Sequence, residues 1–172
     1  MNIYIENEYD KEMKERLDYE KIIEEVVNEA VDYVKCPYEC EVNVTIVTNE
    51  RIHEINNEFR GIDKETDVLS FPMIDYDKPG DFTGFDEIDD YFDLDTGELI
   101  LGDIVISYDR VISQAHEFNH SVRREFAFLV AHSMLHLFGY DHMEEEERKD
   151  MEKRQEEILT KTKYTRDERG LV

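Results

Sequence analysis

The feature that most constrains this fold is an apolar segment at residues 126–138, with the sequence FAFLVAHSMLHLF. Its side chains are apolar except for His132, Ser133 and His136. A helix that is apolar on nearly all sides is buried inside a protein. A buried imidazole without a partner costs on the order of 1–3 kcal/mol. The segment therefore predicts a central helix whose two histidines have polar partners.

The spacing of the histidines indicates a metal as that partner. His132 and His136 are four residues apart, which puts both rings on one face of a helix. Gly139 predicts the end of the helix, because glycine adopts the left-handed conformation common there. The turn that follows can return His142 to the same place. Three histidines without an evident fourth ligand are typical of catalytic zinc, whose remaining position is open. We predict one Zn²⁺ on His132, His136 and His142; two histidines bonded to backbone carbonyls and a third at the surface are the alternative.

Other zinc chemistries fit the sequence less well. In the H-E-x-x-H zinc peptidases a glutamate base follows the first histidine; here that residue is Ser133, which cannot take a proton from water at neutral pH. The H-x-E and P-C-x-x-C pattern of zinc deaminases is also absent from the sequence. Cys36 and Cys40 have no second cysteine pair to complete a tetrahedral site, so we predict two reduced thiols.

The remaining hydrophobic pattern predicts a mixed α+β fold. The alternating segment 41–49 and the segments 66–72 and 98–107 predict strands, and the last is apolar enough to be central in its sheet. Asp18 and Asn49 are the predicted N-caps of two helices, and Gly61 is the predicted end of the second. We expect one domain over residues 1–172, with a small sheet of about four strands packed with five to six helices. The helical segments are 19–34, 50–60, 108–117, 121–138 and 144–160.

The charge and hydropathy of the sequence limit the classes of partner that the protein can bind. The net charge of −24 argues against a nucleic-acid partner at long range. Ten of the acidic residues lie in 75–98 beside the single Lys78, in what we expect to be a long, mobile loop. Positive charge gathers at Arg110, Arg123, Arg124 and the tail 161–172, which leaves room for a local basic groove. The sequence has no signal-peptide core and no apolar run near the roughly 20 residues of a membrane helix. We expect a cytoplasmic protein without a membrane partner.

Three segments resemble a known family. HSMLHLFGYDH, residues 132–142, is similar to the H-G-x-L-H-L-x-G-Y-D-H motif of the YbeY family of bacterial rRNA-processing metalloproteins. FRGIDKETDVLSFP, residues 59–72, and LGDIVIS, residues 101–107, resemble two other characteristic segments of that family, in the same order. Ser133 departs from the motif, which has glycine there, but a small residue still permits close helix packing.

The resemblance implies a zincin-like fold with zinc on His132, His136 and His142. It further implies an endoribonuclease specific for single-stranded RNA, with roles in 16S rRNA 3′-end maturation and ribosome quality control. The implied partners are ribosomal RNA, a small-subunit ribosomal protein and a ribosome-assembly GTPase. The functional arginine of the family corresponds to Arg60. Arg60 and His132 are therefore the expected catalytic residues, with Arg60 on the scissile phosphate.

Several alternatives stay open from the sequence. The chain could be a metal-dependent amide or ester hydrolase, or a non-catalytic ribosome assembly factor with structural zinc. In a nuclease, either water or the ribose 2′-hydroxyl could be the nucleophile. Asp103 and Asp141 are candidates to orient the metal-binding rings, or are a turn residue or cap. Thr66, Asp67 and Ser70 are candidates for the floor of the site, or satisfy loop backbone.

Overall fold

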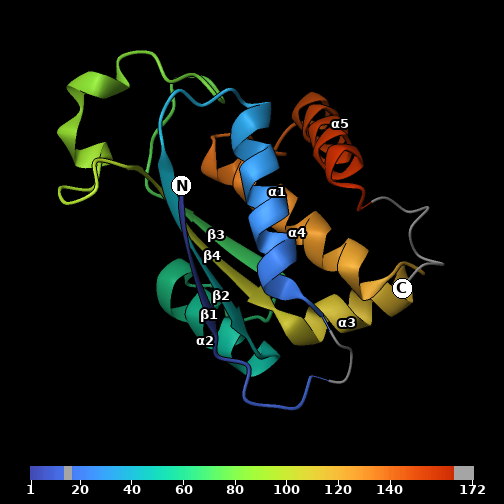
Figure 1. Cartoon of the computed structure of the whole chain (residues 1–172). Coiled ribbons are helices and arrows are strands. Elements are labelled where there is room, and N and C mark those ends of the chain that lie inside the picture. Colours follow the sequence, from blue (N-terminus) through green and yellow to red (C-terminus); the bar gives the residue numbers. More distant parts are fainter. Residues whose placement is uncertain (14–16, 165–172) are drawn as a thin grey trace.

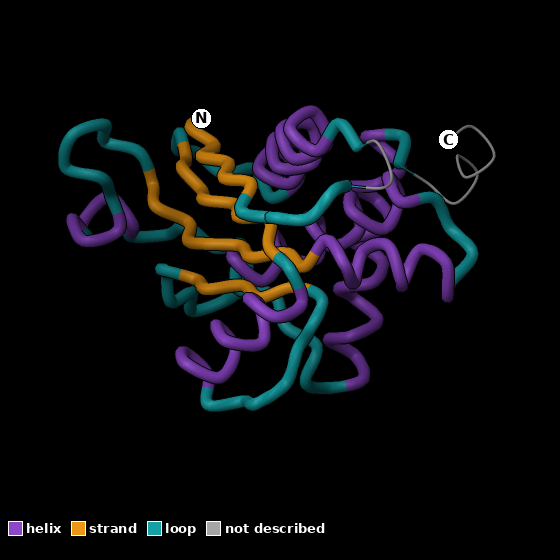
Figure 2. The backbone as a smooth tube through the Cα atoms, turned by 90° about the horizontal axis from the view of Figure 1, so that it is seen from below, coloured by secondary structure: helices purple, strands orange, loops and turns teal. Residues whose placement is uncertain are grey.

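Four strands form one mixed sheet in the computed structural model, which describes residues 1–13 and 17–164. The sheet order is β1-β2-β4-β3. β1, β2 and β4 are parallel, whereas β3 runs antiparallel to β4. Figure 2 shows the strands side by side in one layer. The strands are β1 (Asn2–Asn7), β2 (Cys40–Val47), β3 (Val68–Pro72) and β4 (Leu99–Ser107).

Five α-helices of the described residues cover this sheet unequally, as Figure 1 shows. The main hydrophobic core joins the sheet to α1, α3, α4 and α5 on one side. A small second core packs α2 against the other side. The predicted α+β fold is therefore confirmed. The helices are α1 (Tyr19–Tyr33), α2 (Asn49–Arg60), α3 (Tyr108–Glu117), α4 (Val122–Leu137) and α5 (Glu145–Thr162).

Strand β4 is central, as its composition predicts, because it pairs with β2 on one side and β3 on the other. Successive side chains of a strand point to opposite faces of the sheet. Ile104 and Ile106 belong to the main core, and Val105 belongs to the core under α2. A strand buried on both faces needs apolar side chains at nearly every position.

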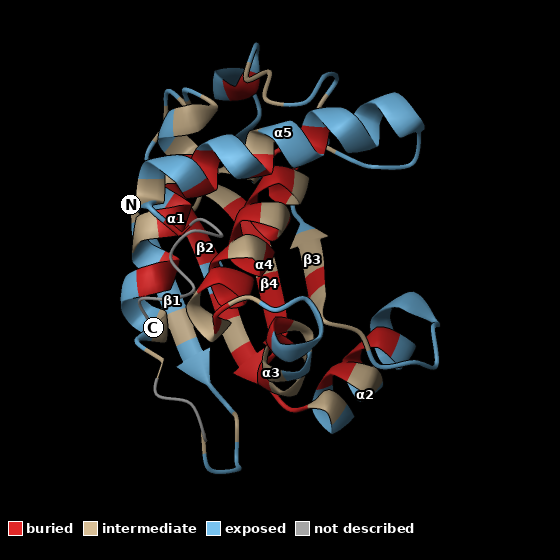
Figure 3. Ribbon diagram, turned by 90° about the vertical axis from the view of Figure 1, so that its right-hand side faces the viewer, coloured by how far each residue is buried: buried red, intermediate tan, exposed pale blue. Residues whose placement is uncertain are grey.

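Helix α4 is the predicted central helix. It packs against α1, α3, α5 and the sheet. Most of its residues are buried, and much of its ribbon is red in Figure 3. The helix ends where Gly139 was expected to end it: Gly139 has a φ of +95°, and its N–H donates to the carbonyl of His136 at 3.0 Å. None of the described helices is both long and apolar enough to cross a membrane.

Two local features differ from the predictions. The edge strand β1 was not assigned from the sequence, because only alternate residues such as Ile3 and Ile5 pack against the core in an otherwise polar segment. The N-cap of α2 is Thr48, whose Oγ1 accepts from the N–H of Arg51, and not Asn49. The Asn49 side chain accepts instead from the hydroxyl of Ser107, at 2.6 Å. The caps at Asp18 and Gly61 are confirmed.

The acidic segment 75–98 is a long connection that aromatic side chains attach to the core. It contains two single-turn 3₁₀ helices, Phe85–Glu87 and Asp89–Tyr91. Phe85 is buried, and its ring lies 5.2 to 5.5 Å from those of Tyr76, Phe82 and Tyr91, measured between centroids. The acidic side chains remain mostly at the surface. The segment therefore has acidic side chains at the surface and aromatic side chains packed against the core. The number of charges in the sequence did not indicate this packing.

Of the arginines that the sequence suggested for a basic groove, Arg124 is buried. Its Nη2 pairs with Glu156 at 2.7 Å, and its Nη1 donates to the carbonyl of Tyr164 at 2.9 Å. Arg123 lies over the ring of Tyr164, 5.2 Å from the centroid. Residues 165–172 of the basic tail lie outside the described residues. Arg124 therefore has a structural position between α4 and α5.

Gly102 is the glycine that the sheet requires. It has a φ of +138° at a register irregularity between β2 and β4. A Cβ there would lie 2.2 Å from the backbone oxygen of Phe71. We expect Gly102→Ala to lower the free energy of unfolding by about 3 kcal/mol, because strain and a backbone clash add. Gly84→Ala is the control: its φ is +81° but the added methyl meets open space, so roughly 1 kcal/mol is expected. Equal losses in chemical denaturation would contradict the clash.

Candidate metal centre

Three imidazole rings converge at the C-terminal end of α4. His132 and His136 come from the helix, and His142 comes from the turn that follows it. One ring nitrogen from each of the three lies within 4.8 Å of the others. The Nε2 atoms of His132 and His136 are 3.0 Å apart. Local sequence explains this geometry, because the i, i+4 spacing aligns the first two rings and the turn at Gly139 returns the chain.

The outer nitrogens of the two helical rings have hydrogen-bond partners. Nδ1 of His136 lies 2.9 Å from the carbonyl oxygen of Tyr140. Because a carbonyl only accepts, this Nδ1 carries the proton, and Nε2 presents a lone pair. Nδ1 of His132 donates in the same way to Oε1 of Gln155, at 3.0 Å. Gln155 is buried on α5. Both histidines therefore have their Nε2 lone pairs turned toward the centre of the site.

This donor set fits a divalent metal ion such as Zn²⁺. Two Nε2 lone pairs facing each other at 3.0 Å cannot form a hydrogen bond between themselves, whereas a cation that both coordinate makes the contact attractive. Tetrahedral zinc with bonds of 2.0–2.1 Å places two ligand nitrogens about 3.3 Å apart, close to this separation. Among the described residues, the metal-ligating group consists of His132, His136 and His142 and has no fourth side chain. A fourth position would thus be available to a substrate.

The electrostatics of the site keep the buried rings neutral. Burial, and to a lesser extent the neighbouring His132, lowers the pKa of His136 to about 4. Burial also lowers the pKa of His132, against the opposing effect of the bond to Gln155. Only the neutral imidazole binds a metal. Both rings are therefore in the ligating form at neutral pH.

A cavity of about 250 Å³ opens beside the histidines, between α4 and α5. It exposes His132 and His142 to solvent, and it supplies the path by which a substrate can reach the ligands. Arg148 is the one Lys or Arg side chain among the described residues that line it. The guanidinium of Arg148 pairs with Glu145 at 2.7 Å and with Glu152 at 3.2 Å. The other lining residues are Asp67, Phe128, Leu129, Met151, Glu152 and Gln155.

Of the loop residues considered for the floor of the site, Asp67 lies in this cavity. It also satisfies backbone, because its Oδ1 accepts from the N–H of Val68 at 2.7 Å. Both interpretations of Asp67 are thus correct. The hydroxyl of Thr66 contacts the Asp67 carboxylate at 3.4 Å. Ser70 lies within β3 and does not line this cavity.

The two aspartates considered as orienting groups have other partners. Asp141 accepts from the backbone N–H of His142 at 2.8 Å, which is the role of a turn residue. Asp103 accepts from the side chain of Asn43 at 2.8 Å and lines a cavity on the α2 side of the sheet. Gln155 orients the ring of His132, and the Tyr140 carbonyl orients the ring of His136.

Arg60 is exposed on the last turn of α2 and does not line the cavity that contains His132 and His142. Its catalytic role stays a prediction. His53, on the same helix, is satisfied by Asp63 at 2.6 Å. Cys36 and Cys40 are free thiols with their sulfurs 3.5 Å apart, as expected.

Sequence reasoning missed Gln155 and Arg148, which α5 brings to the histidines. One sequence pattern could have revealed Gln155. The buried residues of α5 are Met151, Gln155, Ile158 and Leu159, at helical spacing, so Gln155 is a polar residue on an apolar stripe. A buried polar side chain requires a hydrogen-bond partner. No comparable sequence pattern identifies Arg148, because it lies among many charged residues on an exposed face of α5.

We expect Gln155→Ala to weaken metal binding by about 10- to 100-fold, because the groups that orient ligand imidazoles contribute that much to affinity. Gln155→Glu keeps an acceptor for the Nδ1–H of His132 and should bind at least as tightly as the unmodified chain. The measurement is titration of Zn²⁺ against a chromophoric chelator. Lys153→Ala, at an exposed position of α5, is the control. Unchanged affinity in Gln155→Ala would show that the bond does not orient the ring.

Comparison with known proteins agrees with this site. The profile of the family described as "Endoribonuclease YbeY" matches residues 4–163. Proteins with that name from Lachnospira eligens and Lachnoclostridium phytofermentans are 58% and 54% identical to the chain. The alignments cover 92% and 96% of the chain, and 97% and 100% of those proteins. A solution structure from Thermotoga maritima has a TM-score of 0.53 at 28% identity, covering 92% of the chain and 90% of that protein. This chain therefore belongs to the endoribonuclease YbeY family.

Proposed function

We propose that the protein is a zinc-dependent endoribonuclease that cleaves single-stranded RNA. The observation that carries this proposal is the pair of Nε2 lone pairs, 3.0 Å apart, beside an open cavity. Membership of the endoribonuclease YbeY family supports RNA as the substrate. An amide or ester hydrolase is less well supported, because the residue after His132 is the fully buried Ser133 and not a glutamate base.

Each residue of the site has a specific role in this proposal. His132, His136 and His142 hold the ion, which when bound supplies Lewis acidity for phosphodiester cleavage. Gln155 and the Tyr140 carbonyl fix the tautomers of the helical rings, so that their Nε2 atoms stay directed at the ion. Arg60 binds the scissile phosphate with its planar guanidinium and offsets the charge that develops there.

The wider role that we propose is 16S rRNA 3′-end maturation and ribosome quality control in the cytoplasm, with the chain acting as a single domain over residues 1–172. A small-subunit ribosomal protein and a ribosome-assembly GTPase are the proposed partners. The net charge of −24 favours delivery by a protein partner, because such a charge repels RNA at long range.

A metal-removal experiment tests the activity. We expect the Zn²⁺-loaded protein to cleave a short single-stranded RNA, and chelation to abolish cleavage without loss of the circular dichroism of the fold. None of the three histidines belongs to the large hydrophobic core, so we expect the core to persist without the ion. If the zinc were structural, its removal would instead unfold the chain. Product ends identify the nucleophile: a 5′-phosphate indicates water, and a 2′,3′-cyclic phosphate indicates the ribose. Cleavage of a peptide panel with RNA left intact would favour the hydrolase alternative.

Arg60→Ala tests the proposed phosphate contact. We expect the variant to bind zinc and unfold like the unmodified chain, because Arg60 is exposed, yet to cleave RNA at least about 100-fold more slowly, since removing one charge-stabilising donor from an active site costs that much. Arg51→Ala is the matched control on the same helix, where Arg51 pairs with Glu54 at 3.2 Å. Full cleavage by Arg60→Ala in a gel assay would refute its catalytic role.

A further inference from the structure

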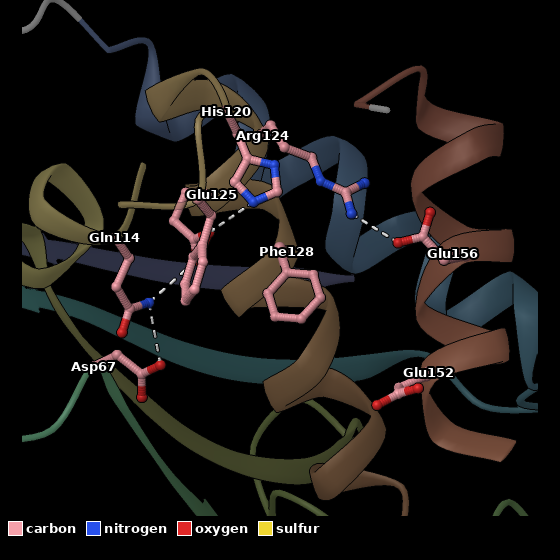
Figure 4. A pocket seen from close by; sticks show the side chains of 9 residues that line it. Asp67, Gln114, His120, Arg124, Glu125, Phe128, Glu152 and Glu156 are labelled. Atoms are coloured by element: carbon pink, nitrogen blue, oxygen red, sulfur yellow. Dashed lines mark hydrogen bonds and ion pairs between the residues drawn. The ribbon is translucent and has the colours of Figure 1, made fainter. Parts of the chain in front are cut away.

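A second, larger cavity adjoins the metal centre. Its volume is about 540 Å³, within the range of ligand-binding pockets. It shares Asp67, Phe128 and Glu152 with the cavity that contains His132 and His142, so the two are neighbours. Figure 4 shows Asp67 and Gln114 on one side, two glutamates of α5 on the other and the ring of Phe128 between them. The remaining lining residues are Phe118, His120, Arg124, Glu125 and Glu156.

The charge of this larger cavity disfavours a phosphate as its occupant. Four of its lining side chains are carboxylates, at Asp67, Glu125, Glu152 and Glu156. Arg124, the one arginine among the described residues that line it, is already paired with Glu156 at 2.7 Å. An anion would meet net negative charge, whereas a neutral group with N–H donors would meet acceptors. The segment of RNA that suits this cavity is therefore a base.

Two aromatic rings provide the apolar surface that a base requires. Phe128 lies nearly parallel to the ring of His132, at an interplanar angle of 21° and a centroid distance of 6.2 Å. Phe118 is half-exposed at the end of α3. Proteins that bind single-stranded RNA stack unpaired bases on such rings and read their edges with polar groups. His132 stacks on Phe128, and the Arg124 guanidinium lies 5.7 Å from the centroid of the same ring, so Phe128 offers a base its edge. A base that packs there lies next to the metal centre.

The polar groups define which base edge fits. Arg124 is 1% exposed, and its Nε–H has no hydrogen-bond partner among the described residues. A buried donor of this kind requires an acceptor, such as a base carbonyl. The carboxylates accept from exocyclic amino groups. The side-chain amide of Gln114 bridges two of these carboxylates. Its Nε2 donates to Asp67 at 3.4 Å and to Glu125 at 3.2 Å.

We propose that this cavity is a base-specificity subsite, which binds one unstacked base from a nucleotide flanking the cleaved bond. The base carries both a carbonyl and an exocyclic amino group, as guanine and cytosine do and uracil does not. This inference rests on the proposed nuclease function and identifies the part of the RNA that the site reads. Phe118 stacks the base, Phe128 packs against it, and Glu152 accepts from its amino group.

Single-position changes in the RNA test this subsite. In a single-stranded oligonucleotide, each position around the cleaved bond is replaced in turn by an abasic residue. We expect one flanking position at which loss of the base lowers kcat/KM about 10-fold or more, the effect of losing one stacked base. At that position guanosine should be preferred over inosine, which lacks only the amino group, by on the order of 10-fold.

Two variants connect the preference to the cavity. Phe118→Ala should reduce the cost of the abasic residue, and Glu152→Gln should remove the difference between guanosine and inosine. Both side chains are at least half exposed, so the fold should be kept. Tyr4→Ala, which removes an exposed aromatic ring from β1, is the control and should behave like the unmodified chain. Equal cleavage of every abasic substrate, or a preference unchanged in both variants, would refute the subsite.

Binding separates this inference from the proposed function. The affinity of the same oligonucleotides for the zinc-free chain, measured by fluorescence anisotropy, does not require cleavage. Affinity that depends on the base and falls in Phe118→Ala, in a protein that cleaves no RNA, would support the subsite and refute the nuclease. Cleavage that is independent of the base would support the nuclease and refute the subsite.

Discussion

The structure of the site depends on the burial of two imidazoles within helix α4. Burial makes their protonation costly, which is why the pKa of both His132 and His136 is lowered. Burial also requires a hydrogen-bond partner for the Nδ1 of each ring. Gln155 is the partner of His132, and the Tyr140 carbonyl is the partner of His136. Because these partners take the Nδ1 protons, the lone pairs that remain face one another, and a divalent cation is the species that such an arrangement favours.

The acidic composition can be reconciled with an RNA substrate through the distribution of charge around this centre. The carboxylates of the larger cavity suit the N–H groups of a base and repel phosphates. Among the described residues that line the metal cavity, Arg148 is the one Lys or Arg side chain that can meet a phosphate. RNA binding of this kind depends on the stacking and edge contacts of one base near the metal, and less on a continuous basic groove.

Predictions from the sequence were accurate where short-range periodicity determined the structure. The central strand β4, the buried helix α4 and the end of that helix at Gly139 follow from patterns within about a dozen residues. Prediction failed where a side chain forms a hydrogen bond with a residue far away in the sequence. Asn49 is not a cap, because its side-chain oxygen accepts from the hydroxyl of Ser107 on β4. It also failed for β1, whose short polar pattern becomes a strand only when β2 pairs with it.

The sequence alone determined the three candidate ligands, because an i, i+4 pair followed by a glycine turn is local geometry that needs no other part of the chain. Only the tertiary structure decided what surrounds them. The packing of α5 on α4 brings Gln155 to His132, buries Arg124 against Glu156 and forms the two cavities. These contacts join residues 23 to 32 positions apart. Their partners are selected by how two helices dock, and no pattern within either helix contains that information.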